Sequence, residues 1–405
     1  MEKFKLKKAI SYKWYALLFA AVYFVSYISR INYGAIISEM ETETNISRSL
    51  LSVAITGSFV TYGIGQIISG IFGDRASPKK LVSLGLLVTA AMNLLIPLYS
   101  NPYYMLVVWC VNGLAQAFMW PPIVKLMAAI YSEEEYKSNS VKVSWGASFG
   151  TIAVYLISPA IISLFNWKFV FIFSGVSAII MMIFWNILCV EPENIITEKE
   201  NEKSGKKGLG KLFSFTLIGI MFSIILQGML RDGVTTWMPS FISDTYKIDN
   251  LIAILTAVIL PIFSIFSYQL ASVLYSKIFK NPLVCAGVMF GVAAVSGLCL
   301  VVFSNSNAVV SIVFSAILTG MMHGVNVILI CMIPPFFKKY GLVSTASGVL
   351  NSCTYIGSSV STYGIALLSE NLGWGFTLKI WLLIAVFGTA ICFLCAKPWH
   401  KKFSN

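Results

Sequence analysis

Twelve stretches of mainly apolar residues run through this sequence. Each is about 20 residues or longer, which is enough to cross a lipid bilayer as a helix. The predicted spans are 13–38, 50–72, 80–99, 103–131, 140–165, 167–190, 213–243, 250–275, 281–304, 308–337, 341–368 and 374–396. Of the 405 residues, 57% are hydrophobic and 11% are charged, whereas soluble domains carry about 25% charged residues. A soluble globule has too little interior to bury this excess. The sequence therefore predicts an all-α protein embedded in the lipid bilayer.

One polar segment divides the spans into two sets of six. It covers residues 191–212 and holds five glutamates and five lysines. Two equal sets of spans around a central polar segment are typical of transporters built from a repeated bundle. We predict two pseudo-symmetric six-helix bundles at 1–190 and 213–405, joined by a cytoplasmic linker at 191–212.

The basic residues predict how the chain is oriented. Its formal net charge is +12, which in a soluble protein would point to nucleic acid, but short cytoplasmic loops of membrane proteins also collect Lys and Arg. With the N-terminus inside, 22 of the 29 Lys and Arg residues fall in cytoplasmic segments and three in outer loops. We expect both termini in the cytoplasm, a location in the cell membrane and no nucleic-acid partner.

Two arginines lie deep inside predicted spans. Arg30 and Arg231 lie 17 and 18 residues after the start of the first span of their respective halves. Each costs about 3 kcal/mol or more at the bilayer centre. Asp232 is the one acidic residue well inside a span, and neighbouring helical residues point about 100° apart, so it is not expected to neutralise both arginines. We infer that the guanidinium groups remain unneutralised until an anionic substrate arrives. The alternative is that carbonyl and hydroxyl groups at helix interfaces satisfy them.

Arginine rather than lysine favours a particular anion. The planar guanidinium binds carboxylate or phosphate through two parallel hydrogen bonds, and two such groups favour phosphate. Tyr and His side chains can donate to the same anion and stack on an organic moiety. The predicted additional substrate-binding residues near mid-span are Tyr23, Tyr27, Tyr62, His323 and Tyr355. Tyr23 and Tyr27 precede Arg30 by seven and three residues, so they share its helix face.

Enzymatic chemistry is not indicated. The sequence has two histidines and lacks the H-E-x-x-H and G-x-S-x-G motifs, so we expect no catalytic residues, no metal and no cofactor. The eight cysteines lie in apolar stretches and are interpreted as buried small residues.

The loop after the second span resembles the signature of the major facilitator superfamily. Gly70, Asp74, Arg75 and Lys79 match its G-x-x-x-D-R-x-x-x-K pattern. Charged groups at cytoplasmic helix ends can pair in one conformational state and separate in another. We therefore predict that Asp74, Arg75 and Lys79 control gating. The equivalent loop of the second half carries Ser276 where an acidic residue is common, which predicts a weaker latch there.

A narrower resemblance covers nearly the whole chain. The segment from Asn112 to Pro122 is similar to the N-G-x-x-Q-x-x-x-W-P-P segment of the organophosphate:phosphate antiporters. The other matching segments are Tyr27-x-x-Arg30-x-Asn32, Ser144-Trp145, Arg231-x-Gly233-x-x-x-Trp237-x-Pro239 and Gly348 to Gly357. This resemblance implies the major facilitator fold, a monomer and a rocking motion of the two halves around the substrate. It also implies that Arg30 and Arg231 clamp a phosphoryl group, with Tyr23, Tyr27, Tyr62 and Tyr355 lining the same pocket.

Three positions depart from that family. Gln66 replaces a lysine on the second span, Phe149 replaces a histidine on the fifth, and His323 stands where glycerol-phosphate transporters have a tyrosine. We include Gln66 among the predicted substrate-binding residues. Because part of the family's cation set is missing or moved, the substrate is expected to be a phosphate ester or a related carboxylate.

The predicted function is secondary active transport of a small organic anion by alternating access, in exchange for inorganic phosphate. Two alternatives remain. One is a membrane sensor that binds a sugar phosphate without moving it. The other is a proton-coupled transporter of organic acids, in which Asp232 or His323 would carry the proton.

Overall fold

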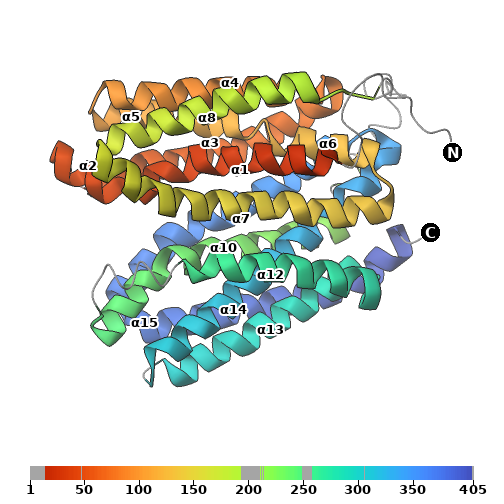
Figure 1. The fold of residues 1–405 in the computed structure, drawn as a ribbon. Coiled ribbons are helices and arrows are strands. Elements are labelled where there is room, and N and C mark those ends of the chain that lie inside the picture. Colours follow the sequence, from red (N-terminus) through yellow and green to blue (C-terminus); the bar gives the residue numbers. More distant parts are fainter. Residues whose placement is uncertain are drawn as a thin grey trace. The chain divides into compact units, whose positions relative to one another are not determined.

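The computed structural model describes residues 14–46, 48–192, 210, 212, 214–248, 258–304 and 306–403. These residues form helices joined by short turns, without a strand among them (Figure 1). Eleven of the helices in this described part are long and apolar enough to cross a membrane. The predicted all-α membrane fold is confirmed. Most of the predicted linker, 191–212, lies outside the described residues.

The helical elements follow the order of the predicted spans. Those up to residue 188 are α1 (Tyr15–Ala35), α2 (Ile37–Thr44), α3 (Arg48–Arg75), α4 (Pro78–Leu95), η2 (Ile96–Leu98), α5 (Pro102–Gln116), α6 (Trp120–Ile130), α7 (Glu133–Leu164) and α8 (Trp167–Leu188). Those from residue 215 onward are α10 (Phe215–Tyr246), α12 (Ile259–Val273), η3 (Leu274–Ile278), α13 (Pro282–Phe303), α14 (Ala308–Asn326), η4 (Val327–Cys331), η5 (Pro334–Tyr340) and α15 (Val343–Phe403).

The chain forms two compact units. The first comprises Met1–Gly208 and Phe337–Ser352, and the second comprises Leu209–Phe336 and Cys353–Asn405. The predicted domain boundaries stay a prediction, and the start of α15 groups with the first unit. Glycines allow this close packing: a Cβ atom added to Gly348 would lie 2.1 Å from the Gln66 carbonyl oxygen, and one added to Gly70 would lie 2.8 Å from that of Ser344.

Within the first unit, α1 packs along α7, and α3 packs along α5. Two glycines one turn apart on α7 bring α1 and α7 close. A Cβ atom added to Gly146 would lie 2.3 Å from the Ala20 carbonyl oxygen, and one added to Gly150 would lie 2.5 Å from that of Phe24. Small residues spaced by four are the usual means by which membrane helices approach each other.

The second unit repeats this pairing. Gly228 on α10 faces Thr354 on α15, where an added Cβ would lie 2.2 Å from the carbonyl oxygen. Gly357 on α15 faces the Ile225 carbonyl oxygen of α10 at 2.0 Å by the same measure. The contact between the first and fifth predicted spans therefore recurs between the seventh and eleventh. This repeated pairing agrees with two pseudo-symmetric bundles.

The fourth and tenth predicted spans are broken helices rather than continuous ones. Between α5 and α6, the amides of residues 117–119 bond to carbonyls three residues back, and Pro121 and Pro122 follow without N–H groups to donate. The tenth span passes from α14 through the wide turn η4 into the 3₁₀ segment η5, which begins at Pro334. Prolines thus divide both helices, which the apolar runs alone did not show.

The eleventh and twelfth predicted spans are joined in α15. Gly373 separates them with φ of 76°, a left-handed conformation that favours glycine. The stretch before Gly373 is not among the eleven apolar helices, because hydroxyl and amide side chains lower its hydropathy. Its buried polar residues are Ser344, Thr345, Ser347, Asn351, Ser352, Thr354, Ser358 and Ser361. This helix is therefore built to pack against protein.

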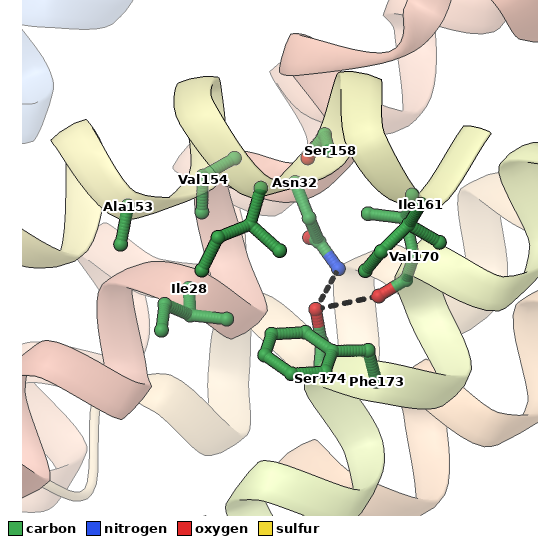
Figure 2. Close-up of a pocket in the computed structure, with 10 residues that line it drawn as sticks. Ile28, Asn32, Ala153, Val154, Ser158, Ile161, Val170, Phe173 and Ser174 are labelled. Atoms are coloured by element: carbon green, nitrogen blue, oxygen red, sulfur yellow. Dashed lines mark hydrogen bonds between the residues drawn. The ribbon is translucent and has the colours of Figure 1, made fainter. Parts of the chain in front are cut away.

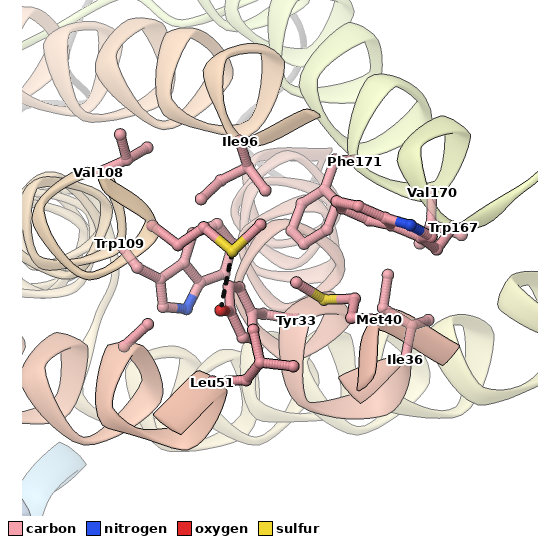
Figure 3. Close-up of a cluster of buried hydrophobic side chains, with 12 residues drawn as sticks. Tyr33, Ile36, Met40, Leu51, Ile96, Val108, Trp109, Trp167, Val170 and Phe171 are labelled. Carbon is pink, nitrogen blue, oxygen red and sulfur yellow. Dashed lines mark hydrogen bonds between the residues drawn. The ribbon is translucent and has the colours of Figure 1, made fainter. Parts of the chain in front are cut away.

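An aromatic cluster lies in the core of the first unit (Figure 3). The ring of Tyr33 lies 5.1 Å from that of Trp109, and Phe171 contacts both Trp109 and Trp167 in edge-to-face geometry. The Tyr33 hydroxyl lies 3.5 Å from the Met105 Sδ atom. Tyr33 lies one turn after Arg30 on α1, so this aromatic packing borders the turn that carries Arg30.

Candidate functional site

Arg30 lies on α1 among aromatic rings. Its guanidinium carbon is 4.3 Å from the centroid of Tyr27 and 4.7 Å from that of Tyr62, and the residue is 8% exposed. Tyr23 extends the row, with its ring 5.7 Å from Tyr27 and 4.9 Å from Trp120. Aromatic faces attract a cation and hold a planar guanidinium in a fixed orientation. The structure thus brings Arg30 together with three of the predicted tyrosines.

Amide side chains of α5 fix the backbone of α1 next to Arg30. The Asn112 Nδ2 atom donates to the Ser29 carbonyl at 3.2 Å, and the Gln116 Nε2 atom donates to the Ser26 carbonyl at 3.2 Å. The Ser26 hydroxyl donates in return to Gln116 Oε1. Asn112 and Gln116 lie one turn apart, so both reach the same face of α1. Sequence reasoning used these residues only for the family resemblance and missed this positioning role.

A second set of amides continues the network on the same helix. Asn32 Nδ2 donates to Asn93 Oδ1 on α4 at 2.8 Å and to the Ser174 hydroxyl on α8 at 2.9 Å. Asn93 Nδ2 donates to the Ser29 carbonyl at 3.1 Å. Three helices thereby hold the turn of α1 that carries Arg30. The Asn residues interrupting apolar runs were the available signal, because a buried amide requires hydrogen-bond partners.

Asn32 and Ser174 also border a small groove of about 10 Å³ between α1, α7 and α8 (Figure 2). The remaining lining is mainly apolar, as Ile28, Val154 and Phe173 show, and Arg30 is not part of it. A groove without a cationic group is a poor site for an anion, so we do not assign substrate binding there.

Gln66 is fully buried on α3, and both the nitrogen and the oxygen of its side-chain amide form hydrogen bonds to the protein. Its Nε2 atom donates to the Ala117 carbonyl at 3.4 Å, and its Oε1 atom accepts from Asn351 Nδ2 at 3.0 Å. Its predicted substrate contact stays a prediction. The structure assigns it a role in holding α3 to the break between α5 and α6.

Arg231, on α10 of the second unit, forms an ion pair with its neighbour. Its Nε and Nη2 atoms donate to the two carboxylate oxygens of Asp232 at 2.6 and 2.8 Å. The expectation that both arginines stay unneutralised is therefore wrong for Arg231. The arginine side chain is long enough to reach its neighbour, and an unpaired charged group inside a membrane span is costly.

The predicted residue His323 and Ser358, which was not predicted, lie around this ion pair. The Ser358 hydroxyl of α15 donates to Asp232 Oδ2. His323 on α14 lies within electrostatic range of both members of the pair, and its Nδ1 atom is 3.1 Å from the Tyr268 hydroxyl. Tyr355 is buried on α15, one turn before Ser358. The second unit thus gathers Arg231 and His323 with a carboxylate and hydroxyl groups.

Asp74 at the end of α3 caps the first turn of α15. Its carboxylate oxygens accept from the amides of Ser344 and Thr345, each at 2.8 Å. The Lys125 Nζ atom donates to the carbonyls of Gly73 and Asp74 at 3.0 Å. An acidic group at a helix start and a basic group at a helix end both oppose the helix dipole. Asp74 therefore pairs with backbone donors here. The sequence did not predict that Lys125 would bind the carbonyl groups at the end of α3.

The other two signature residues have different surroundings. Lys79 lies near the end of α8, where its Nζ atom donates to the Asn186 carbonyl at 2.8 Å. Its amide donates to a Glu191 carboxylate oxygen at 2.7 Å. Arg75 occupies the last turn of α3, where its charge complements the helix dipole. The structure brings Asp74, but not Lys79, to the start of α15.

The family model described as Major Facilitator Superfamily matches residues 19–362. The chain belongs to this superfamily. As a member of the major facilitators it resembles a "Probable hexose phosphate transport protein" of Chlamydia muridarum, with 21% identity over 89% of this chain and 85% of the relative.

Two further relatives have related names. The "Membrane sensor protein UhpC" of Salmonella typhimurium is 20% identical over 87% of this chain and 84% of its own. The "Glycerol-3-phosphate transporter" of Bacillus subtilis is 25% identical over 54% of each chain. These names agree with the resemblance to organophosphate:phosphate antiporters that the motifs predicted.

Solved structures show the same fold. The proton:xylose symporter XylE aligns with a TM-score of 0.76 and 13% identity over 96% of this chain and 95% of its own. FucP aligns with a TM-score of 0.75 and 12% identity over 95% of this chain and 98% of its own. The chain is therefore an integral membrane protein with the major facilitator fold. Within its described residues there is no cluster of three His, Cys, Asp or Glu side chains suited to a metal.

Proposed function

We propose that this protein transports an organic phosphate across the cell membrane by alternating access, in exchange for inorganic phosphate. Three observations support the proposal: the superfamily, the names of the relatives, and one arginine inside a span of each half, Arg30 buried and Arg231 partly exposed. Arg30 and Arg231 would both bind the phosphoryl group during the transport cycle. Tyr23, Tyr27, Tyr62, His323, Tyr355 and Gln66 are the proposed additional pocket residues.

The surroundings of Arg30 are the observation that carries the proposal. Two tyrosine rings lie against the Arg30 guanidinium, and a guanidinium can bind a phosphoryl group through two parallel hydrogen bonds. The amide network then fixes its depth in the bundle. Such an arrangement is costly in a membrane unless it serves an anion.

We further propose that both termini lie in the cytoplasm and that the protein works as a monomer. The excess of Lys and Arg in the predicted inner segments supports this orientation. In this orientation Asp74, Arg75 and Lys79 lie at the cytoplasmic ends of helices. Asp74 would hold the start of α15 in one state of the cycle and release it in another.

Counterflow in proteoliposomes tests the proposed function. Vesicles containing the purified protein are loaded with unlabelled phosphate, and uptake of labelled inorganic phosphate is measured. We expect uptake that depends on internal phosphate and is inhibited by hexose phosphates or glycerol phosphate more strongly than by dicarboxylates. Inhibition by dicarboxylates alone would instead identify an organic-acid transporter.

The similarity to UhpC keeps a sensor as the second candidate. A sensor would bind a sugar phosphate, seen as a shift in thermal unfolding, without any counterflow. Binding together with counterflow would establish transport, whereas binding alone would contradict it.

A further inference from the structure

We propose that Asp232 is an internal substitute for the substrate. It neutralises Arg231 while the carrier is empty, and it gives way when an anion binds. This inference rests on the proposed function, because it assumes that Arg231 meets an anionic substrate. It assigns a specific task to a carboxylate that the exchange mechanism does not otherwise use.

The geometry of the pair carries the proposal. Asp232 contacts Arg231 with both oxygens, at 2.6 and 2.8 Å, which is the two-bond arrangement that a phosphate or a substrate carboxylate would itself adopt. The two residues are adjacent in sequence, so the carboxylate stays within reach of the guanidinium wherever α10 moves. An arriving anion competes with a group that has the same charge and the same bonding pattern.

Ser358 gives the carboxylate a second place to bond. Its hydroxyl donates to Asp232 Oδ2 while its own helix is held close to α10 at Gly228 and Gly357. When an anion takes the guanidinium, Asp232 can keep this hydrogen bond. The second unit thus contains both hydrogen-bond donors to the Asp232 carboxylate: Arg231, which is given up when the anion binds, and Ser358, which is kept.

The consequence concerns the empty carrier. An arginine without a counter-charge is costly at mid-membrane, and it would oppose any conformational change made without substrate. With Asp232 in place the charge of Arg231 is already neutralised. The carrier can then reset while empty, so net uptake accompanies exchange.

The test compares Asp232→Asn with the unmodified protein in two assays. Binding of inorganic phosphate, sulfate and succinate is measured on the purified carrier by calorimetry. Net uptake of labelled phosphate into phosphate-free vesicles is then compared with uptake into phosphate-loaded vesicles. We expect binding of the preferred anion to tighten by about tenfold, the equivalent of about 1.4 kcal/mol, and the ratio of net uptake to exchange to fall.

Matched variants separate this role from folding. Asp232→Glu keeps the charge and should preserve the uptake ratio. Asp244 lies on the same helix, where it accepts from the Trp374 indole at 3.0 Å, so Asp244→Asn removes a carboxylate without affecting Arg231. It should leave both assays unchanged. Ser358→Ala removes the hydrogen bond that Asp232 keeps after an anion displaces it from Arg231, so this variant should weaken anion binding, opposite to Asp232→Asn.

The outcomes distinguish the two proposals. Unchanged or weaker anion binding in a folded Asp232→Asn protein would overturn the role of Asp232 while leaving phosphate transport intact. Tighter binding of succinate without any phosphate binding would support Asp232 and contradict phosphate as the substrate. If neither protein bound any of the three anions, both proposals would fail.

Discussion

Arg30 and Arg231 occupy matching positions in the sequences of the two halves, yet their surroundings differ. Arg30 lies over two tyrosine rings on a helix that neighbouring amides hold in place. Arg231 is already bonded to a carboxylate on the next residue. The first site presents a charge next to aromatic faces, and the second presents an ion pair that we propose is exchanged when an anion binds. Arginines at equivalent positions of a repeat can therefore have different roles. We propose that Arg30 attracts the anion in the first half, and that Arg231 changes its carboxylate partner for the anion in the second half.

Replacing either arginine with lysine should have the largest effect. A lysine ammonium carries the charge but cannot form two parallel hydrogen bonds or stack on tyrosine. We expect Arg30→Lys and Arg231→Lys each to lower phosphate exchange by about 100-fold, the equivalent of about 3 kcal/mol. Exchange in proteoliposomes with equal protein incorporation is the measurement. Lys168→Gln removes a positive charge beside Trp167 and should have no effect. Normal exchange by Arg231→Lys would refute its contact with substrate.

The sequence predicted the helices well and their interactions less well. Apolar runs mark membrane helices because every backbone group must be paired within the bilayer. The same runs do not reveal the breaks near Pro121 and Pro334, since proline within a membrane helix is compatible with either a kink or a break. A sequence also shows which residues share a helix face, as Tyr27 and Arg30 do, because that relation is local.

Contacts that depend on side-chain bending or on other helices could not be predicted in the same way. Arg231 reaches Asp232 although neighbouring residues point in different directions, because the arginine side chain is long enough to fold back. Asn112 reaches the Ser29 carbonyl from another helix, so the pairing depends on how α5 packs on α1. The presence of a buried amide is visible in the sequence, but its partner is not.

The signature loop and its counterpart in the second half provide the next comparison. Asp74 accepts from two amides at the start of α15, whereas the Ser276 hydroxyl donates to Ser272 on its own helix. Asp74→Ala should cost about 1–2 kcal/mol, as the loss of a helix cap does, and slow exchange. Ser276→Ala should change neither. Thermal unfolding and exchange rates measured on both variants check this, and equal effects would remove the distinction between the two loops.

The amide network around Arg30 should affect substrate binding through the position of α1. Asn112→Ala leaves the Ser29 carbonyl with one donor fewer and should cost about 1 kcal/mol of stability. It should also raise the KM for phosphate, because Arg30 is no longer held at its depth. Asn101 caps the opposite end of α5 by accepting from Tyr103 and Tyr104. Asn101→Ala should lower the Tm to a similar degree without changing the KM, and a parallel rise in KM would show that the network acts through stability alone.

The smallest effect concerns the tyrosine rings that lie over Arg30 in the first half. Tyr62→Leu removes a ring that lies 4.7 Å from the guanidinium carbon and should weaken phosphate binding by about threefold, as the loss of a cation–π contact of about 0.5–1 kcal/mol implies. Tyr62→Phe keeps the ring and should bind phosphate nearly as well as the unmodified protein. Calorimetric titration of both variants separates the two contributions of tyrosine. If Tyr62→Phe lost as much affinity as Tyr62→Leu, the hydroxyl would be the contributing group, and the first site would then resemble the second, where hydroxyl and carboxylate groups surround the arginine.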